Sequence, residues 1–295
     1  MPPTGPGAEP ALYVHGLGGS GQNWTELASL LGDRLQGQTI DLPGFGLSEP
    51  VKRYGITPFA SRVIRWIEYS DRGPVHLFGN SLGGAVSVRV AATRPDLVRS
   101  LTLISPAMPF IDPRWSVQSR LLPLLFLPRA AQMASRRMAG ADPAELARMV
   151  YETCYADHSR ITDQMIFEAA EEARRQKELS WYADAYVKTF RDLIRTFVRA
   201  YLPGSGSLWK LASLIQAPTL VISGRQDRLI DVRVAPRVAS VIPDSRLLIL
   251  DQVGHTAQME VPRTVARATL GLLDELAERH PTPPPRPAPY DSLSE

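Results

Sequence analysis

The chain has 295 residues, of which 44% are hydrophobic and 21% are charged, and this length is enough for a large hydrophobic core. Its 33 Lys and Arg nearly balance its 30 Asp and Glu, and the net charge is +3. No block of basic residues alternates with aromatic ones, so the composition argues against nucleic acid as a partner and indicates an ordinary soluble globular protein.

The cysteine content and the first ten residues indicate the cellular compartment in which the protein is located. Cys154 is the single cysteine, so an internal disulfide is excluded and a reducing compartment is favoured. It falls on the apolar side of a predicted helix, which favours a small core residue over a reactive thiol. Residues 1–10 have neither a charged start nor an apolar centre, so we expect no signal peptide and a cytoplasmic location.

Strands and helices alternate in the first part of the chain. The first predicted strand, residues 11–15, runs into the loop Gly16-Leu17-Gly18-Gly19-Ser20-Gly21 and then into a helix with apolar residues at helical spacing. A second strand, ending over residues 38–42, precedes a glycine-punctuated loop, and a helix over residues 57–69 leads to a third strand. This alternation predicts a parallel sheet that is covered on both faces.

A serine between glycines follows the third predicted strand, residues 75–80. Gly79 and Gly83 flank Ser81, and residues 85–92 are mostly small and apolar. A side chain at either glycine would collide with the neighbouring strand or helix as the backbone doubles back. The pattern therefore predicts a sharp turn with Ser81 exposed at its crest. A serine that merely caps the next helix is the simpler alternative.

The Gly-x-Ser-x-Gly pattern at residues 79–83 resembles the nucleophile elbow of the α/β-hydrolase superfamily. The strand that runs into His15-Gly16-Leu17-Gly18-Gly19 resembles the oxyanion loop of the same superfamily. The resemblance implies that the backbone N–H groups of Leu17 and Leu82 stabilise an oxyanion. It also implies that His15 shapes its loop rather than acting as a base, and that Asp41 braces the loop after the second strand.

The number of strands is expected to depart from the superfamily pattern. That pattern usually places two antiparallel strands before the His-Gly strand, whereas only ten residues are available here. We therefore expect an α/β fold whose mostly parallel, doubly wound sheet has about six strands rather than eight. Residues 38–42 would then lie at or near an exposed edge, which is either capped by another segment or used for dimerisation. The expected state is a monomer or a homodimer.

Strand signals stop between residue 106 and about residue 210, which predicts a helical cap inserted into the sheet. Asp142-Pro143-Ala144-Glu145 is a strong helix start, and a longer helix has apolar residues from Tyr186 to Tyr201. Met108, Phe110 and Trp115 make the beginning of this cap apolar and are candidates for lining a lipophilic substrate pocket. Packing of the cap onto the core is an equal alternative. The apolar run over residues 121–127 could touch a membrane but is too short to span one.

Two loops at the carboxyl ends of later strands supply an acid and a base. Asp227 follows a predicted strand over residues 218–223, and His255 follows another over residues 246–250. Ligands bind at this edge of open α/β sheets, and Ser81, Asp227 and His255 come in the order that the resemblance implies for a catalytic triad. Asp231 is the rival acid, but Gly-Arg-x-Asp-Arg matches the superfamily's acid loop at Asp227. The other histidines lie in the elbow strand, the cap and the tail: His76, His158 and His280.

The expected organisation is an α/β core from residues 1–105 and 211–280, a helical cap from residues 106–210, and a proline-rich tail over residues 281–295. The tail cannot form a core and is expected to be disordered or in the polyproline II conformation. Its Pro-x-x-Pro spacing could recruit a partner domain, although a solvated tail is the favoured interpretation.

The resemblance implies a serine hydrolase that cleaves carboxylic esters with an apolar acyl or alcohol part through an acyl-enzyme intermediate. Ser81 would be the nucleophile, His255 the base, and Asp227 the residue that orients the base. We expect no metal and no organic cofactor, because no cluster of His, Cys and carboxylates has ligand spacing.

Three alternatives stay open. Residues 254–260, Gly-His-Thr-Ala-Gln-Met-Glu, are similar to a segment of the carbon–carbon bond hydrolases that act on vinylogous diketones, although Thr256 and Met259 stand where that group tends to carry tryptophan. Cofactor-free haloperoxidase or perhydrolase activity would use the same triad. A ligand-binding receptor on a hydrolase fold is the non-enzyme alternative; such proteins commonly lose a triad member, and none is lost in this sequence.

Overall fold

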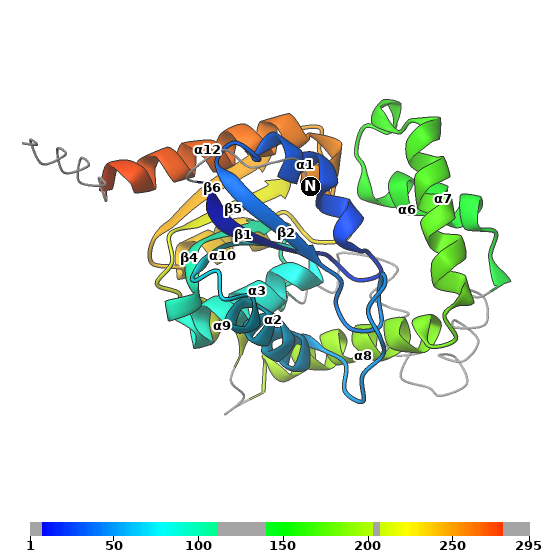
Figure 1. Ribbon diagram of the computed structural model, residues 1–295, viewed down its shortest axis with the longest axis horizontal. Coiled ribbons are helices and arrows are strands. Elements are labelled where there is room, and N and C mark those ends of the chain that lie inside the picture. Colours follow the sequence, from blue (N-terminus) through cyan, green and yellow to red (C-terminus); the bar gives the residue numbers. More distant parts are fainter. Residues whose placement is uncertain (1–7, 111–139, 203–206, 280–295) are drawn as a thin grey trace, which may run out of the picture.

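The computed structural model describes residues 8–110, 140–202 and 207–279, and strands alternate with helices in the first and last of these ranges (Figure 1). The strands are β1 (Glu9–Val14), β2 (Leu35–Ile40), β3 (Val75–Asn80), β4 (Val98–Ile104), β5 (Thr219–Gly224) and β6 (Ser245–Leu250). The helices of the core are α1 (Thr25–Leu30), α2 (Ile56–Ser70), α3 (Leu82–Thr93), α9 (Leu208–Ala212), α10 (Val234–Val241), α11 (Ala257–Glu260) and α12 (Pro262–Arg279).

Within the described residues, the strands form one six-stranded sheet in the order β2-β1-β3-β4-β5-β6. Every neighbouring pair is parallel. The predicted fold class, a parallel sheet of about six strands rather than eight, is therefore confirmed. The carboxyl ends of all strands meet at one rim of the sheet, which is where the loops after β1, β3, β5 and β6 begin.

Helices cover both faces of this sheet. Figure 1 shows α1 and α12 along one face and α2, α3 and α9 along the other. Two separate clusters of buried apolar side chains correspond to these faces, one including residues of α2, α3 and α10 and the other residues of α1 and α12. Every residue of β3 and β5 is buried. Strands that are covered on both faces have continuous apolar sequences, and for this reason β3 and β5 could be predicted from the sequence.

The strand β2 lies at one edge of the sheet, as predicted, although it spans Leu35–Ile40 rather than residues 38–42. Side chains from α2 and from the loop after it cover part of this edge. The Trp66 indole N–H donates to Gln38 Oε1 at 3.3 Å, and the Arg72 guanidinium donates to the Gln36 carbonyl. Arg72 thus occupies a carbonyl that an added strand would need. Dimerisation at this edge stays a prediction.

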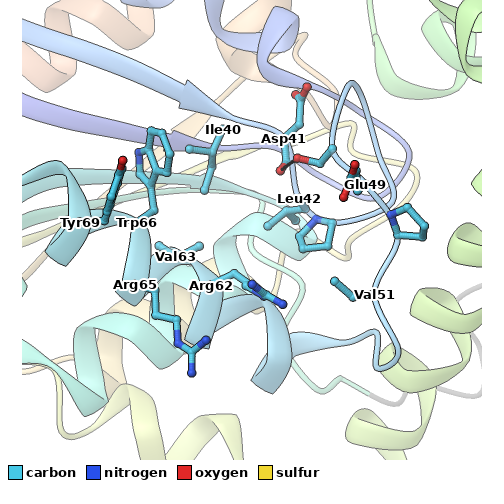
Figure 2. A pocket seen from close by; sticks show the side chains of 13 residues that line it. Ile40, Asp41, Leu42, Glu49, Val51, Arg62, Val63, Arg65, Trp66 and Tyr69 are labelled. Atoms are coloured by element: carbon cyan, nitrogen blue, oxygen red, sulfur yellow. Dashed lines mark hydrogen bonds between the residues drawn. The ribbon is translucent and has the colours of Figure 1, made fainter.

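An open hollow of about 530 Å³ lies beside the same edge (Figure 2). Its lining comes from the end of β2, the loop that follows and one face of α2, and includes Ile40, Glu49, Arg62 and Trp66. Neither Ser81 nor His255 contributes to it, so this hollow is separate from the candidate residues at the rim of the sheet.

Between β4 and β5, the described residues form helices and turns only. Besides α9, they comprise α6 (Pro143–Cys154), the 3₁₀ turn η4 (His158–Arg160), α7 (Asp163–Glu178) and α8 (Tyr182–Arg199), and we call residues 140–202 the helical insertion. Asp142 caps α6 as predicted, because its Oδ1 accepts the N–H groups of Ala144 and Glu145 at 2.9 and 3.1 Å.

Several predictions fall on residues that the structure does not describe: Trp115, the apolar run over residues 121–127, and the tail over residues 281–295. Among the helices that are described, none combines the length and the apolar character that crossing a membrane would require. The cytoplasmic location stays a prediction.

Candidate active site

The turn between β3 and α3 has the geometry that its glycines predict. Ser81 has φ 52° and ψ −117°, a conformation that is strained for a residue with a side chain. A Cβ at Gly79 would lie 2.5 Å from the Gly83 carbonyl oxygen, and one at Gly83 would lie 2.2 Å from that of Val14. The Ser81 side chain makes no capping hydrogen bond to α3. A helix-capping role therefore does not account for this serine.

The glycine-rich loop after β1 lies directly beside Ser81. A Cβ added at Gly16 would be 3.2 Å from Ser81 Cβ and 3.1 Å from Asn80 Oδ1. As the first residue of α3, Leu82 has no acceptor for its N–H within the helix. The Leu17 N–H also donates to no acceptor among the residues that the structure describes. Of the two predicted oxyanion donors, Leu82 thus comes directly after Ser81 in the chain, and Leu17 comes directly after Gly16, which lies beside Ser81.

His15 and Asp41 hold this loop in place. The buried His15 ring accepts the Leu42 N–H at Nε2 (2.9 Å), and its Nδ1 donates to the Gly16 carbonyl at 2.6 Å. Asp41 accepts the N–H groups of Gly21 and Leu47 at 2.7 and 2.8 Å. Burial lowers the pKa of His15. With both ring nitrogens engaged, His15 shapes the loop and is not available as a base.

Asp227 and His255 meet as a buried pair at the same rim. His255 Nδ1 lies 2.8 Å from Asp227 Oδ2, and the two side chains are 5% and 0% exposed. Asp227 Oδ1 also accepts the N–H groups of Leu229 and Ile230 at 2.8 and 2.9 Å. Burial acts to raise the pKa of Asp227, but the His255 charge and the hydrogen bonds outweigh it and hold the pKa below its ordinary value. The carboxylate is therefore ionised and oriented toward the imidazole.

The rival acid and the other histidines have different partners. Asp231 pairs with Arg233, whose Nε lies 2.9 Å from Asp231 Oδ1. His76 lies in β3 with Nδ1 2.7 Å from Ser100 Oγ, and His158 Nε2 lies 3.0 Å from the Glu152 carbonyl oxygen. His280 lies outside the described residues. Of the two acids, it is thus Asp227 that contacts His255.

Asn80 joins the serine turn to the histidine loop. Its Nδ2 donates both to the Ile104 carbonyl at 3.1 Å and to the His255 carbonyl at 3.2 Å. The residue immediately before Ser81 therefore contacts His255 itself. Loops that follow β3 and β6 meet at this point, although they are far apart in the sequence.

The candidate pocket residues separate into three cases. Met108 is buried in the hydrophobic cluster that includes α3. Phe110 is half-buried, and the Arg233 guanidinium lies over its ring with Cζ 5.1 Å from the ring centroid. Trp115 is not described. In the described ranges, no group of three or more His, Cys, Asp or Glu side chains could hold a metal ion.

Two tyrosines of α8, Tyr182 and Tyr186, contact the glycine-rich loop, and the sequence did not predict this contact. The Tyr182 hydroxyl donates to the Gly18 carbonyl at 3.2 Å. A Cβ at Gly18 would lie 2.9 Å from the Tyr186 ring, so this ring rests on the loop. The apolar spacing of α8 showed that it has a packed face, but not which loop that face covers. Burial also raises the pKa of the nearby Cys154 thiol to about 12, which keeps it protonated at neutral pH.

A family profile described as "alpha/beta hydrolase fold" matches residues 10–262. The chain belongs to the α/β-hydrolase family. The match covers β1 through α11 and includes Ser81, Asp227 and His255.

The proteins similar in sequence to this α/β hydrolase are named for different activities. The dihydrolipoyllysine-residue acetyltransferase component of the acetoin cleaving system of Pseudomonas putida is 28% identical over 91% of this chain, which spans only 64% of that protein. Monoacylglycerol lipase ABHD6 of Bos taurus is 27% identical over 94% of this chain and 78% of its own length. The 2-hydroxy-6-oxononadienedioate/2-hydroxy-6-oxononatrienedioate hydrolase of Cupriavidus pinatubonensis is 28% identical over 92% of this chain and 88% of its own.

Solved structures share the fold of this α/β hydrolase. The meta-cleavage product hydrolase from Pseudomonas fluorescens IP01 superposes with a TM-score of 0.72 and 18% identity, over 92% of this chain and 93% of that one. At this identity the likeness is one of fold alone.

Proposed function

We propose that this α/β hydrolase is a serine hydrolase that cleaves carboxylic esters with an apolar acyl or alcohol part. The observation that carries the proposal is the buried Asp227–His255 hydrogen bond of 2.8 Å, in a loop tied by Asn80 to the strained turn of Ser81. A nucleophile, a base within the same rim and an acid that orients the base are the parts that acyl transfer requires.

The chemistry follows from the position of the proton on the imidazole. With Nδ1–H donating to Asp227, the Nε2 lone pair of His255 is left to accept the Ser81 hydroxyl proton as Oγ attacks the ester carbonyl carbon. The Leu17 and Leu82 N–H groups would hold the oxyanion. His255 then gives the proton to the departing alcohol, which leaves an ester between the acyl group and Ser81. Water, deprotonated by His255, attacks this ester, and His255 returns the proton to Ser81 Oγ as the bond to the acyl group breaks and the carboxylic acid leaves.

Aromatic side chains beside the glycine-rich loop support an apolar substrate. Tyr182 and Tyr186 rest on this loop, and Phe110 lies close to β4 in the chain. The similarity to monoacylglycerol lipase ABHD6 is consistent with an ester of this kind. The corresponding partner is a small lipophilic ester.

Carbon–carbon bond hydrolysis is the second candidate. Residues 254–260 resemble the corresponding segment of that group, and a relative of 28% identity is named as such a hydrolase. Thr256 and Met259 depart from the pattern, which places this activity behind ester hydrolysis. Haloperoxidase or perhydrolase activity on the same residues, and a receptor without catalysis, have no further observation in their favour.

The decisive experiment is labelling with a fluorophosphonate probe, with Ser81→Ala as the control. The wild-type protein should be labelled and the variant should not, and turnover of a p-nitrophenyl ester should fall about 10⁶-fold in the variant. Folded wild-type protein that shows no Ser81-dependent labelling would favour the receptor instead. A p-nitrophenyl ester series of rising acyl length, run beside a vinylogous diketone, separates the two hydrolase activities.

A further inference from the structure

The loop that carries His255 is fastened to the helical insertion as well as to the core. The His255 N–H donates to the Cys154 carbonyl at 2.6 Å. Gly254 approaches the same group so closely that a Cβ there would lie 2.2 Å from the Cys154 oxygen. Because Cys154 is the last residue of α6, the proposed base and the insertion share a direct backbone contact.

The Glu260 carboxylate joins the two segments at this contact. Its side chain is 0% exposed. Oε2 accepts the Gly254 N–H at 2.7 Å, while Oε1 accepts the N–H groups of Ala156 and Asp157, each at 3.0 Å. A buried carboxylate is costly unless its oxygens are hydrogen-bonded, and three amides offset that cost. One side chain therefore connects the residue before His255 to the residues that follow α6.

Arg160 completes this group, which we call the Glu260 clamp: Glu260, Gly254, Gln252, Ala156, Asp157 and Arg160. Arg160 Nη1 lies 3.4 Å from Glu260 Oε1 and donates to the Gln252 carbonyl at 3.1 Å. Gln252 has φ 56°, a left-handed conformation that is costly for a residue other than glycine. The loop that leads to His255 is thus held in shape by a side chain of the insertion.

We infer that Glu260 is a positioning residue, which sets the place of the His255 imidazole relative to Ser81 by locking its loop against the insertion. The inference rests on the proposed serine hydrolysis. Proton transfer requires heavy atoms within about 2.6–3.2 Å, and a displacement of about 1 Å can cost about 10²-fold in rate. Asp227 and Asn80 hold His255 from the core, and Glu260 holds the preceding residue from the insertion. At this corner the insertion is part of the frame of the site.

The test is Glu260→Gln, which preserves the shape of the side chain but turns one acceptor oxygen into an NH₂ group that faces backbone N–H donors. The rate of fluorophosphonate labelling should fall about 10²-fold. The kcat for a p-nitrophenyl ester should fall with it while KM stays nearly unchanged, because the substrate contacts are intact. Amide hydrogen exchange at Gly254, Ala156 and Asp157 should become faster.

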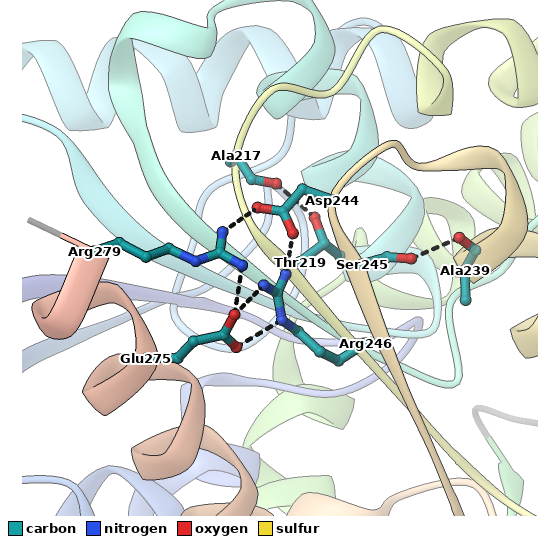
Figure 3. A network of polar contacts seen from close by, with 8 residues as sticks. All are labelled: Ala217, Thr219, Ala239, Asp244, Ser245, Arg246, Glu275 and Arg279. Atoms are coloured by element: carbon teal, nitrogen blue, oxygen red, sulfur yellow. Dashed lines mark hydrogen bonds and ion pairs between the residues drawn. The ribbon is translucent and has the colours of Figure 1, made fainter.

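Glu275→Gln is the matched control. Glu275 lies on α12 and is held by Arg246 and Arg279 at the amino end of β6, away from His255 (Figure 3). This variant should label at the wild-type rate even if it is less stable. Equal losses of labelling in Glu260→Gln and Glu275→Gln would overturn the inference, since both would then reflect stability.

Two further outcomes keep the inference separable from the proposed function. Glu260→Asp retains the charge but is too short to reach both segments; labelling at the wild-type rate in this variant overturns the positioning role, including where the Gln variant fails to fold. If the wild-type protein shows no Ser81-dependent labelling, the proposed function fails. The rate of amide hydrogen exchange at Ala156 and Asp157 in the Glu260 variants then tests by itself whether the Glu260 clamp holds the two segments together. A rate equal to that of the wild type contradicts the clamp.

Discussion

At the scale of single residues, the turn around Ser81 depends on the absence of side chains at its neighbours. An added Cβ at Gly83 would lie 2.2 Å from the Val14 carbonyl oxygen, in backbone that β1 holds in the sheet. Gly83→Ala should therefore lower the free energy of unfolding by about 1–3 kcal/mol or more. Gly271→Ala is the control, because nothing lies within 4 Å of its added Cβ, and it should stabilise α12 by about 0.5–1 kcal/mol. Urea unfolding measures both, and destabilisation of equal size would contradict the steric argument.

Also at this scale, Asp227 is expected to fix the tautomer of His255. In Asp227→Asn the new NH₂ group can donate to Nδ1, which moves the ring proton to Nε2 and leaves no lone pair for the Ser81 hydroxyl. The kcat should fall by about 10⁴-fold, as in other serine triads. Asp231→Asn should stay close to wild type, because Asp231 contacts Arg233 rather than the imidazole. Steady-state kinetics on one ester compare the two variants, and the reverse order would assign the acid to Asp231.

At the scale of elements, His15 links the ends of β1 and β2 and should make stability depend on pH. Burial lowers its pKa in the folded protein, although the Gly16 carbonyl and the Asp41 charge act to raise it. In the unfolded chain His15 has its ordinary pKa of about 6.5. As the pH falls, the unfolded chain therefore binds more protons at this residue than the folded protein does. The stabilisation is complete above pH 6.5 and is lost as the pH falls below that value.

The measurement is the free energy of unfolding in urea at pH 7.5 and pH 5.5, for the wild type and for His15→Gln. The wild type should lose more stability between these values than the variant. Comparing the two proteins removes the contributions of other groups, such as Glu172, whose pKa is raised by burial and whose contribution has the opposite sign. Equal losses in both proteins would show that His15 does not titrate as inferred.

The elements also show where prediction from the sequence ends. The turn at Ser81 was predictable to the residue because its glycines impose a local steric requirement. The strand β2 was predicted as an edge but misplaced in part, since a half-exposed edge strand lacks a continuous apolar run. The contacts of Tyr182, Tyr186 and Glu260 could not be predicted, because they depend on which loops α6 and α8 rest upon.

At the scale of the whole molecule, a parallel sheet brings Ser81, Asp227 and His255 to one rim from three distant loops. The alternation of strands and helices predicted the parallel sheet, whereas the choice of these three residues came from the resemblance of their motifs. At the opposite end of β6, Arg246 and Arg279 join Asp244 to Glu275 and hold α12 against the sheet (Figure 3). These ion pairs are partly exposed, so Glu275→Gln should lower the thermal midpoint slightly at low salt. The effect should shrink in 1 M salt, and a salt-independent loss would point to packing instead.

The position of β5 between β4 and β6 has a consequence for synthesis of the chain. β4 pairs with β5 along Leu101–Ile104, and β5 follows only after the whole helical insertion. Until the ribosome has passed Gly224, β4 is an unpaired, apolar edge strand that can pair with other nascent chains. Chains interrupted before Thr219 should consequently accumulate as insoluble material, and holdase chaperones should be retained on the growing polypeptide until its last strands emerge.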